Sequence, residues 1–312
     1  MGSSFAPLKA GADKVRGMLG GVKAKQDAGA AQEAVTPMLS LIVPASNEEA
    51  LIGGCLEALA ASEGPGVPVE LIVVANGCTD RTVEVAEGLR GTIEARGWRY
   101  QVIDRARGGK LAALNAGDLI AAPGGMRAYV DADVTVSPGL LAEVVTLLNR
   151  EAPAYASGQV RIVGGPGFAS RAYARLWAEV PFMKNSVPGC GFFAVNAAGR
   201  ARWEAFPDVI SDDMFARLQF APEERHQARA GYDWPIADGF ARLVRVRRRQ
   251  DAGVVQIHQL YPDLAAHEDK GRMGLRGLAR LGLRDPVGLA VYVAVALRVR
   301  LGRQGADWSR GR

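Results

Sequence analysis

Residues 126–138 read MRAYVDADVTVSP, an apolar stretch that ends in two carboxylates, Asp131 and Asp133, with one small residue between them. Crowding two like charges at the end of a buried strand is unfavourable unless a cation or hydrogen bonds compensate. In an extended chain both carboxylates would project to one side and Ala132 to the other. Such a pair suits Mg²⁺ or Mn²⁺ bound together with substrate phosphates. The stretch predicts either a solvated turn or a metal site.

Apolar segments of strand length alternate with amphipathic segments on both sides of this stretch. We expect strands at 38–44, 69–75, 100–104 and 126–133, and helices at 48–61, 79–96, 110–122 and 138–149. Strands that are apolar throughout and alternate with helices predict an α/β fold with a mostly parallel central sheet flanked by helices. The loops 44–48, 75–80 and 131–133 should then converge at the carboxyl ends of the strands, where such sheets bind ligands.

The pattern is less regular beyond residue 154. There we expect strands at 158–163 and 190–196 and helices at 170–178, 211–220 and 240–260. The predicted organisation is a loosely ordered extension (1–37), a catalytic-type α/β domain (38–262) and a basic helical C-terminal segment (263–312).

Composition excludes several classes of protein. With 48% hydrophobic and 23% charged residues among 312, the chain is not predicted to be disordered. Three separated cysteines indicate neither a disulfide framework nor a thiolate zinc site. The N-terminus lacks a secretory h-region, and no run of ~18 apolar residues predicts a membrane span. A cytoplasmic location is expected, either free or peripheral on the inner face of the plasma membrane.

Six short motifs, in their order and spacing, resemble the inverting GT-A glycosyltransferases of family 2. They are PASNEEALIGGCLEAL (44–59), VVANGCTDRT (73–82), GGKLAALNAGD (108–118), YVDADVTV (129–136), GCGFFAVN (189–196) and ISDDMF (210–215). The similarity runs from about residue 38 to about residue 260. It implies transfer of a sugar from a nucleotide diphosphate sugar to a hydroxyl acceptor, a glycan, a lipid-linked molecule or a small molecule, with inversion and with Mg²⁺ or Mn²⁺, as in polysaccharide biosynthesis.

The resemblance also implies which residues bind the nucleotide sugar. These are Pro44, Ala45, Asn47, Glu48, Asn76, Lys110, Asn115, Asp131, Ala132, Asp133 and Gly191, with Asp131 and Asp133 holding the metal. Asn76 stands where the family commonly has an aspartate that bonds the base, so the base is left open. Lys110 opens a helix, where a cation is unfavourable unless an anion such as a diphosphate lies nearby.

Asp212 and Asp213 match the acidic pair that supplies the family's catalytic base. In inverting transfer one carboxylate takes the proton of the acceptor hydroxyl as its oxygen attacks the anomeric carbon. We assign the base to Asp213. Asp212 is assigned as a positioning group or helix cap, because adjacent helical residues point in different directions. A simple helix cap at 211–212 is the alternative.

Two basic regions remain open to interpretation. One arginine of the run 245–249 is expected to contact the leaving diphosphate, although the tryptophan motif of processive relatives is missing. Residues 270–312 hold ten Lys/Arg against two Asp, a net charge of +8. Within them, the leucine-rich basic stretch 275–301 either lies in a membrane interface or packs on the catalytic domain. Nucleic-acid binding is not expected, because the basic residues are not interleaved with aromatic ones.

Two other functions compete with glycosyl transfer. A sugar nucleotidyltransferase would share the architecture, but the loop PASNEEA lacks the glycines and basic residues which that chemistry uses. An inactive GT-A scaffold at the membrane is suggested by the altered nucleotide loop. Retention of both acidic pairs argues against it.

Overall fold

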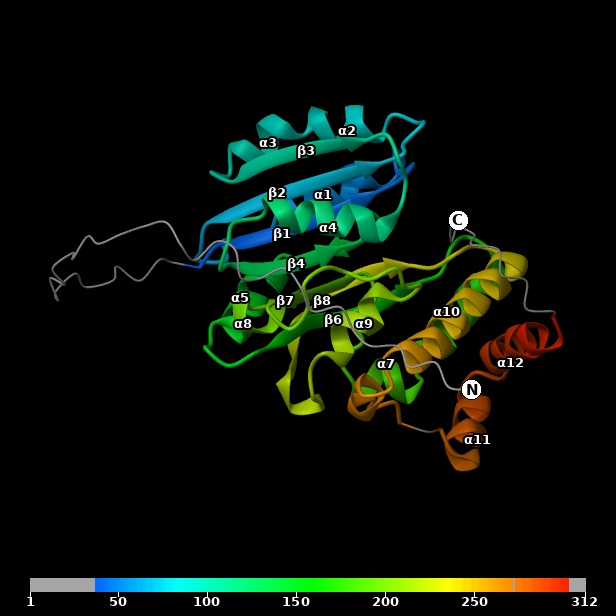
Figure 1. The fold of residues 1–312 in the computed structure, drawn as a ribbon. Helices are drawn as coiled ribbons and strands as arrows, with labels where there is room; N and C mark the ends of the chain where they lie inside the picture. Colours follow the sequence, from blue (N-terminus) through cyan, green and yellow to red (C-terminus); the bar gives the residue numbers. More distant parts are fainter. Residues whose placement is uncertain (1–36, 272, 303–312) are drawn as a thin grey trace, which may run out of the picture. The chain divides into compact units, whose positions relative to one another are not determined.

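The computed structural model describes residues 37–271 and 273–302, which fold around a mixed sheet with the strand order β3-β2-β1-β4-β7-β6-β8-β5 (Figure 1). The strands are β1 (Leu39–Ala45), β2 (Val69–Asn76), β3 (Arg99–Arg105), β4 (Met126–Val130), β5 (Thr135–Val136), β6 (Tyr155–Val163), β7 (Phe192–Val195) and β8 (Arg225–Pro235).

Helices cover this sheet and extend beyond it. They are α1 (Ile52–Ala60), α2 (Thr82–Gly88), α3 (Arg90–Glu94), α4 (Lys110–Ile120), α5 (Leu140–Leu148), α6 (Phe168–Trp177), α7 (Pro181–Asn185), α8 (Ala197–Arg200), α9 (Asp212–Leu218), α10 (Phe240–Leu260), α11 (Leu275–Arg284) and α12 (Pro286–Leu301), with 3₁₀ turns η1 (Pro222–Glu224) and η2 (Leu264–His267). None of the helices in the described ranges is long and apolar enough to cross a bilayer.

The first four long strands are parallel neighbours, and the rest of the sheet is mixed. β1 pairs in parallel with β2 and β4, and β2 with β3, whereas β7 runs antiparallel to both β4 and β6. Parallel register brings the carboxyl ends of β1, β2 and β4 to one edge. This arrangement confirms the predicted α/β fold class.

Both faces of the parallel part are buried because its side chains alternate between two apolar cores. Leu41 and Val43 of β1 pack with Leu56 of α1 in a core that also takes residues from α2, α3 and α5. Ile42 faces the other way and packs with Leu114 of α4 and with residues of α9. Two buried faces explain why these strands are apolar throughout rather than alternating.

A third apolar cluster joins α6, α7, α10 and α12. Its buried members include Tyr173 and Trp177 of α6, Leu243 of α10 and Val295 of α12. α12 packs against both α6 and α10. The boundary predicted at 262/263 stays a prediction, and the predicted extension 1–37 lies outside the described residues except for residue 37.

Apart from shifts of a few residues at element ends, the short elements β5, α7 and α8 were not predicted, and the structure differs from the prediction in three further places. The helix expected at 79–96 is divided into α2 and α3. β4 ends at Val130 rather than at 133, because the backbone turns so that the Val134 amide donates to the Asp131 carbonyl (3.0 Å). β8 was not predicted: a register shift opposite residues 157–159 of β6 disturbs its alternation. Without a period of two, a strand this polar has no strand signature.

Candidate active site

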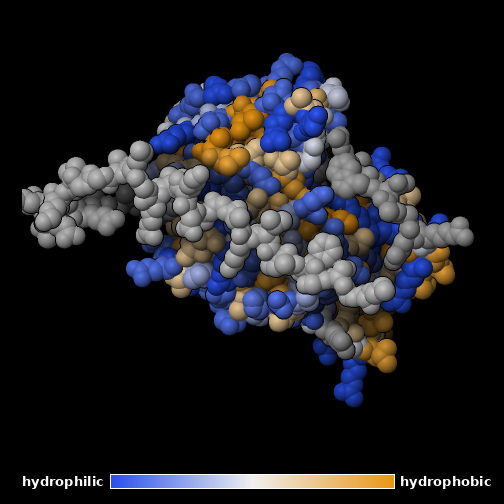
Figure 2. All heavy atoms as spheres, viewed as in Figure 1, coloured by the Kyte–Doolittle hydropathy of each residue, from blue (hydrophilic) through white to orange (hydrophobic). Residues whose placement is uncertain are grey.

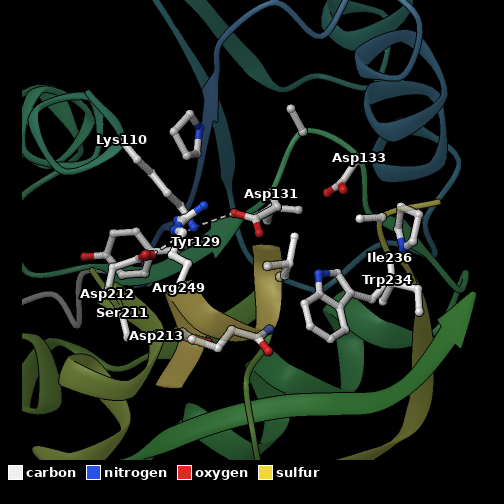
Figure 3. Close-up of a pocket in the computed structure, with 18 of the residues that line it drawn as sticks. Lys110, Tyr129, Asp131, Asp133, Ser211, Asp212, Asp213, Trp234, Ile236 and Arg249 are labelled. Carbon is white, nitrogen blue, oxygen red and sulfur yellow. Dashed lines mark ion pairs between the residues drawn. The ribbon is translucent and has the colours of Figure 1, made fainter. Parts of the chain in front are cut away.

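The carboxyl ends of β1, β2 and β4 and the first residues of α4 and α9 surround a cavity of about 480 Å³ (Figure 3). This size is in the usual range for small-ligand sites. Charged and amide side chains from the strand ends and from the first residues of α4 and α9 line part of the cavity, and we call this set the polar wall. The polar wall consists of Asn47, Glu48, Asn76, Lys110, Asp131, Asp133, Asp212 and Asp213.

Asn47 fixes the first loop against the second. Its backbone adopts a left-handed conformation (φ 57°), which asparagine tolerates better than most residues. Its side-chain Oδ1 accepts hydrogen bonds from the backbone amide of Thr79 (2.7 Å) and from the Thr79 hydroxyl (3.3 Å). The loops after β1 and β2 are therefore held together at the edge of the cavity.

Asn76 ties three segments together from a position that is 2% exposed. Its Nδ2 donates to the carbonyl of Ala45 (2.8 Å), and its Oδ1 accepts from the amide of Gly109 (2.8 Å). The side-chain amide thus joins the end of β1 to the residue before Lys110. An aspartate could accept from Gly109, but it could not donate to Ala45.

Asp131 is positioned by the strand that runs antiparallel to β4. Its backbone amide donates to the carbonyl of Gly191 (2.8 Å), directly before β7. Gly191 has φ 76°, and a Cβ there would lie 2.7 Å from the Trp234 side chain, so this close approach requires glycine. Asp131, Ala132 and Asp133 all line the cavity, although through a turn rather than an extended strand.

Lys110 is the cation that faces these carboxylates (Figure 3). Its Nζ lies 2.8 Å from Oδ1 of Asp131 and 3.0 Å from Oδ2 of Asp212, and its side chain is 35% exposed. Burial on its own would lower the pKa of this ammonium, but Asp131 and Asp212 outweigh it and hold the pKa above its ordinary value. The protein itself therefore supplies, through Lys110, part of the positive charge that offsets the carboxylates of Asp131 and Asp133.

Asp213 lies where its surroundings raise the pKa of its carboxyl. Burial raises the pKa of its carboxyl to about 6, the charge of Asp212 adds to the rise, and Lys110 opposes it. Its Oδ1 accepts from the backbone amide of Met214 (2.8 Å). A carboxylate with a pKa near neutrality takes a proton more readily than an ordinary one and is still ionised at pH 7. Asp212, which is 6% exposed and paired with Lys110, is the less accessible of the two.

Two residues predicted to bind the nucleotide sugar do not line the cavity. The Asn115 amide is bonded to both backbone polar groups of Phe206, donating to the carbonyl (3.0 Å) and accepting from the amide (2.7 Å). Ala45 is buried, and its carbonyl accepts from Asn76. The geometry gives both residues a part in shaping the surrounding loops. Pro44 and Gly191 do line the cavity.

Hydrophobic side chains from segments that sequence motifs did not single out also line the cavity. We call this set the apolar wall. The apolar wall consists of Tyr173 and Trp177 of α6, Trp234 and Pro235 of β8, Ile236 and Ala237 after it, and Leu243 and Val246 of α10. In sequence, aromatic and aliphatic residues on strands and helices are typical of core positions, so no local signal distinguishes them.

The basic run of α10 divides between the cavity and the outside. Arg247 and Arg249 line the cavity. Arg247 also donates to Asp251 (2.9 Å) and to the hydroxyl of Tyr292 (3.3 Å), whereas Arg248 turns away and donates to the backbone carbonyl of Arg298 (2.9 Å). Arg245 is exposed and is not part of the lining. Of the run, Arg247 and Arg249 are therefore placed to meet an anion in the cavity.

The carboxylates fit a hard divalent cation only as a partial ligand set. Asp131 and Asp133 offer oxygen ligands into one cavity, which suits Mg²⁺ or Mn²⁺. Within residues 37–271 and 273–302, no cluster of three or more His, Cys, Asp or Glu side chains stands ready to hold a metal. His267, for instance, bonds the carbonyl of Leu218 (2.8 Å). The remaining ligands would have to come from substrate phosphates and water.

The chain is similar to one known family over the part that carries most of the polar wall. The model of the family described as Glycosyl transferase family 2 matches residues 40–198, just over half of the chain. The chain belongs to glycosyl transferase family 2. The match confirms the predicted family and enzyme class, a glycosyltransferase. It covers Asn47, Lys110 and the Asp131 pair but stops before Asp212, so the proposed base and most of the apolar wall lie outside it.

Individual relatives are more distant and longer. A 4,4'-diaponeurosporenoate glycosyltransferase of Staphylococcus aureus is 30% identical over 217 residues, covering 65% of this chain and 49% of its own. An uncharacterized glycosyltransferase, EpsJ of Bacillus subtilis, is 36% identical over 193 residues, covering 61% and 45%. This glycosyltransferase spans about half the length of the curated relatives it matches.

A similar fold occurs in a solved structure. The mannosyltransferase PcManGT from Pyrobaculum calidifontis, in complex with GDP-Man and Mn²⁺, has a TM-score of 0.53 and 21% identity, over 86% of this chain and 77% of its own. At that identity the likeness shows the GT-A fold. It confirms the fold class predicted from the motifs.

Proposed function

We propose that the protein transfers a sugar from a nucleoside diphosphate sugar to a hydroxyl acceptor with inversion at the anomeric carbon. The observation that carries this proposal is the pairing, in one cavity, of a carboxyl with a pKa of about 6, Asp213, and a carboxylate–lysine cluster formed by Lys110 and Asp131. A base and an anion site facing one space are what such a transfer requires.

The transfer proceeds by a single displacement. The carboxylate of Asp213 takes the proton of the acceptor hydroxyl as the acceptor oxygen forms its bond to the anomeric carbon. The bond from that carbon to the diphosphate oxygen breaks, and the nucleoside diphosphate leaves with the electron pair. Because the oxygen enters opposite the leaving group, one step inverts the anomeric configuration and no covalent enzyme intermediate is needed.

The polar wall serves the donor. Asp131 and Asp133 would hold Mg²⁺ or Mn²⁺ together with the diphosphate, and the bound ion would supply positive charge to the departing phosphate oxygens. Lys110 lies 2.8 Å from Asp131 and can contribute a second cation to the same diphosphate. Asn47 and Glu48 line the cavity at the end of β1, the position proposed for the nucleoside. The proposal names no nucleobase, because the Asn76 amide is already bonded to the Ala45 carbonyl and the Gly109 amide.

Nucleotide binding tests the donor site. We expect UDP or GDP to raise the melting temperature in the presence of Mn²⁺, and to do so much less in its absence, because the protein offers an incomplete ligand set. The carboxamide variant Asp133→Asn should lose the Mn²⁺-dependent part of the shift. Asp208→Asn, on the exposed approach to α9, is the matched control and should keep it. Equal binding by wild type and Asp133→Asn would contradict the metal assignment.

We also propose a peripheral contact with anionic lipid through α11 and α12. Five exposed arginines accompany exposed leucines and valines on these helices, and Figure 2 shows hydrophobic and strongly hydrophilic surface side by side over them. The exposed arginines are Arg276, Arg280, Arg284, Arg298 and Arg300, and the exposed leucines and valines are Leu275, Leu283, Val287, Val293, Leu297 and Leu301. Such a surface combines apolar insertion with attraction to anionic headgroups.

Flotation with phosphatidylglycerol vesicles tests this contact. Arg276→Glu/Arg280→Glu should reduce the floated fraction severalfold. Arg99→Glu/Arg229→Glu, which makes the same charge change at exposed strand positions, should not. If the two double variants floated to the same extent, the proposed lipid contact would be contradicted.

A further inference from the structure

The apolar wall offers little to a polar acceptor. Its aliphatic members Ile236, Leu243 and Val246 face the same cavity as Asp213 and cannot form hydrogen bonds through their side chains. A saccharide pressed against them would lose water from its hydroxyls without gaining partners, which is unfavourable. Binding of a hydrocarbon there would be favoured by a free energy that grows in proportion to the apolar area removed from water.

The wall is held in a fixed shape by a row of aromatic contacts. The distance between ring centroids is 5.3 Å for Trp234 and Trp177 and 5.5 Å for Trp177 and Tyr173. Tyr173 in turn stacks on Tyr292 of α12, with a centroid distance of 5.2 Å. Contacts at these distances contribute beyond the area they bury. The apolar surface of the cavity is therefore built before any acceptor arrives, and it is continuous with the cluster in which α12 packs on α6 and α10.

Aromatic residues alone would not distinguish a sugar acceptor from a hydrocarbon acceptor, because a tryptophan face also stacks on sugar rings. The residues after Trp234 decide the matter: Pro235, Ile236 and Ala237 continue the wall without a side-chain hydrogen-bond donor or acceptor. The polar lining residues of α10 are Arg247, Arg249 and Gln250. Arg247 is already bonded to Asp251 and Tyr292, and Arg249 is one of the two arginines placed to meet an anion.

We infer that the acceptor hydroxyl is carried on an apolar, lipid-like body which lies along the apolar wall. This inference rests on the proposed function and names its acceptor class. The hydroxyl at the end of a hydrocarbon gives its proton to Asp213, and its oxygen bonds to the anomeric carbon as the nucleoside diphosphate departs. The product is a glycoside of a long-chain alcohol or of a hydroxylated lipid.

A chain-length series tests the inference on the full-length protein. Radiolabelled UDP-glucose, UDP-N-acetylglucosamine and GDP-mannose are offered with primary alcohols from butanol to dodecanol and, in a parallel arm, with maltose. The KM for the alcohol should fall about fourfold for each added methylene until the wall is filled, which corresponds to ~0.8 kcal/mol for each buried methylene. Maltose should be a poor acceptor.

A substitution in the wall supplies a second readout. Ile236→Ser should flatten the dependence of KM on chain length, because it replaces apolar contact with a hydroxyl. Ile120→Ser, the same change at an exposed position at the end of α4, should keep the wild-type dependence. A KM independent of chain length in the wild type, or a preference for maltose, would overturn the inference while leaving glycosyl transfer intact. If none of these donors is turned over, either with an alcohol or with water, the proposed function is overturned as well.

Discussion

The polar wall and the apolar wall of one cavity are built by different means. Half of the side chains of the polar wall come from the loops after β1 and β4, and the others come from the end of β2 and the first residues of α4 and α9. Short hydrogen bonds fix members of this wall, such as those of Asn47 to Thr79 and Asn76 to Gly109. The apolar wall comes from β8, α6 and α10 and is fixed by ring contacts such as Trp177 on Trp234.

This difference separates chemistry from recognition. In the polar wall a single lost charge leaves a close partner uncompensated, so substitutions there should change the chemical step or donor binding by large factors. In the apolar wall the contribution of each residue is spread over many weak contacts. Changes there should act mainly on acceptor selection, and in smaller steps.

The largest effect is expected from the proposed base. Asp213→Asn keeps the size of the side chain but cannot take a proton, so kcat should fall about 10²–10⁴-fold. Nucleotide affinity, measured by calorimetry with Mn²⁺, should change far less. Asp208→Asn, at an exposed position just before α9, should retain wild-type kcat. If Asp213→Asn turned over at the wild-type rate, another group would have to be the base.

Much of the polar wall could be predicted from sequence, because its residues lie in or next to segments with a recognisable local pattern. The apolar runs of β1, β2 and β4 predicted a parallel sheet, and parallel strands bring the loops that follow them to one edge. The pattern therefore predicted where Asp131 would lie, whereas Lys110 and Asp213 were named from the resemblance to family motifs; all three are found around one cavity. Their roles stay predictions.

The apolar wall could not be predicted, because its parts meet only in the folded chain. Trp234 lies on β8, whose buried positions Arg225, Ala228 and Tyr232 do not alternate after a register shift. Asn115 shows the opposite problem. Its motif suggested a ligand contact, whereas its amide is bonded to the Phe206 backbone, 91 residues away in sequence. Long-range contacts of this kind leave no local pattern.

The central ion pair of the polar wall should give the next largest effect. Lys110→Met removes the cation from both Asp131 and Asp212, and Asp212 is nearly buried. We expect nucleotide affinity to fall about 10–100-fold, the value of a charge-assisted hydrogen bond of ~1.5–3 kcal/mol, and the melting temperature to fall with it. Calorimetry and thermal unfolding measure the two effects.

A matched lysine provides the control. Lys184 pairs with Glu179 at 2.7 Å, but within the described residues it has this single carboxylate partner, whose side chain is 36% exposed, whereas the side chain of Asp212, a partner of Lys110, is 8% exposed. Lys184→Met should therefore change the free energy of unfolding by less than about 0.5 kcal/mol and leave nucleotide affinity as it is. Equal losses for the two variants would show that the position of Lys110 between two carboxylates has no special value.

A substitution at Asn76 tests whether this residue of the polar wall holds the loops together or recognises the nucleobase. Asn76→Asp restores the residue that the family commonly carries, yet it removes the Nδ2 donor that bonds Ala45 and sets a carboxylate against that carbonyl. We expect a loss of about 1–3 kcal/mol in the free energy of unfolding, because the site is buried. Asn149→Asp at the exposed end of α5 is the control. A rise in uridine nucleotide affinity without loss of stability would instead make residue 76 a base-recognition position.

The smallest effect concerns the pH at which the base works. Since the pKa of Asp213 is raised to about 6, the fraction in the active, ionised form should fall as pH drops through 6, and kcat/KM should lose about tenfold for each further unit. Asp212 is one cause of the rise and Lys110 opposes it. Asp212→Asn should therefore move the acid limb of the pH–rate profile to lower pH, because a nearby negative charge is removed while the lysine stays. A limb that moved to higher pH, or did not move, would mean that the charge of Asp212 does not set the pKa of the base, and that Asp212 serves only to hold Lys110.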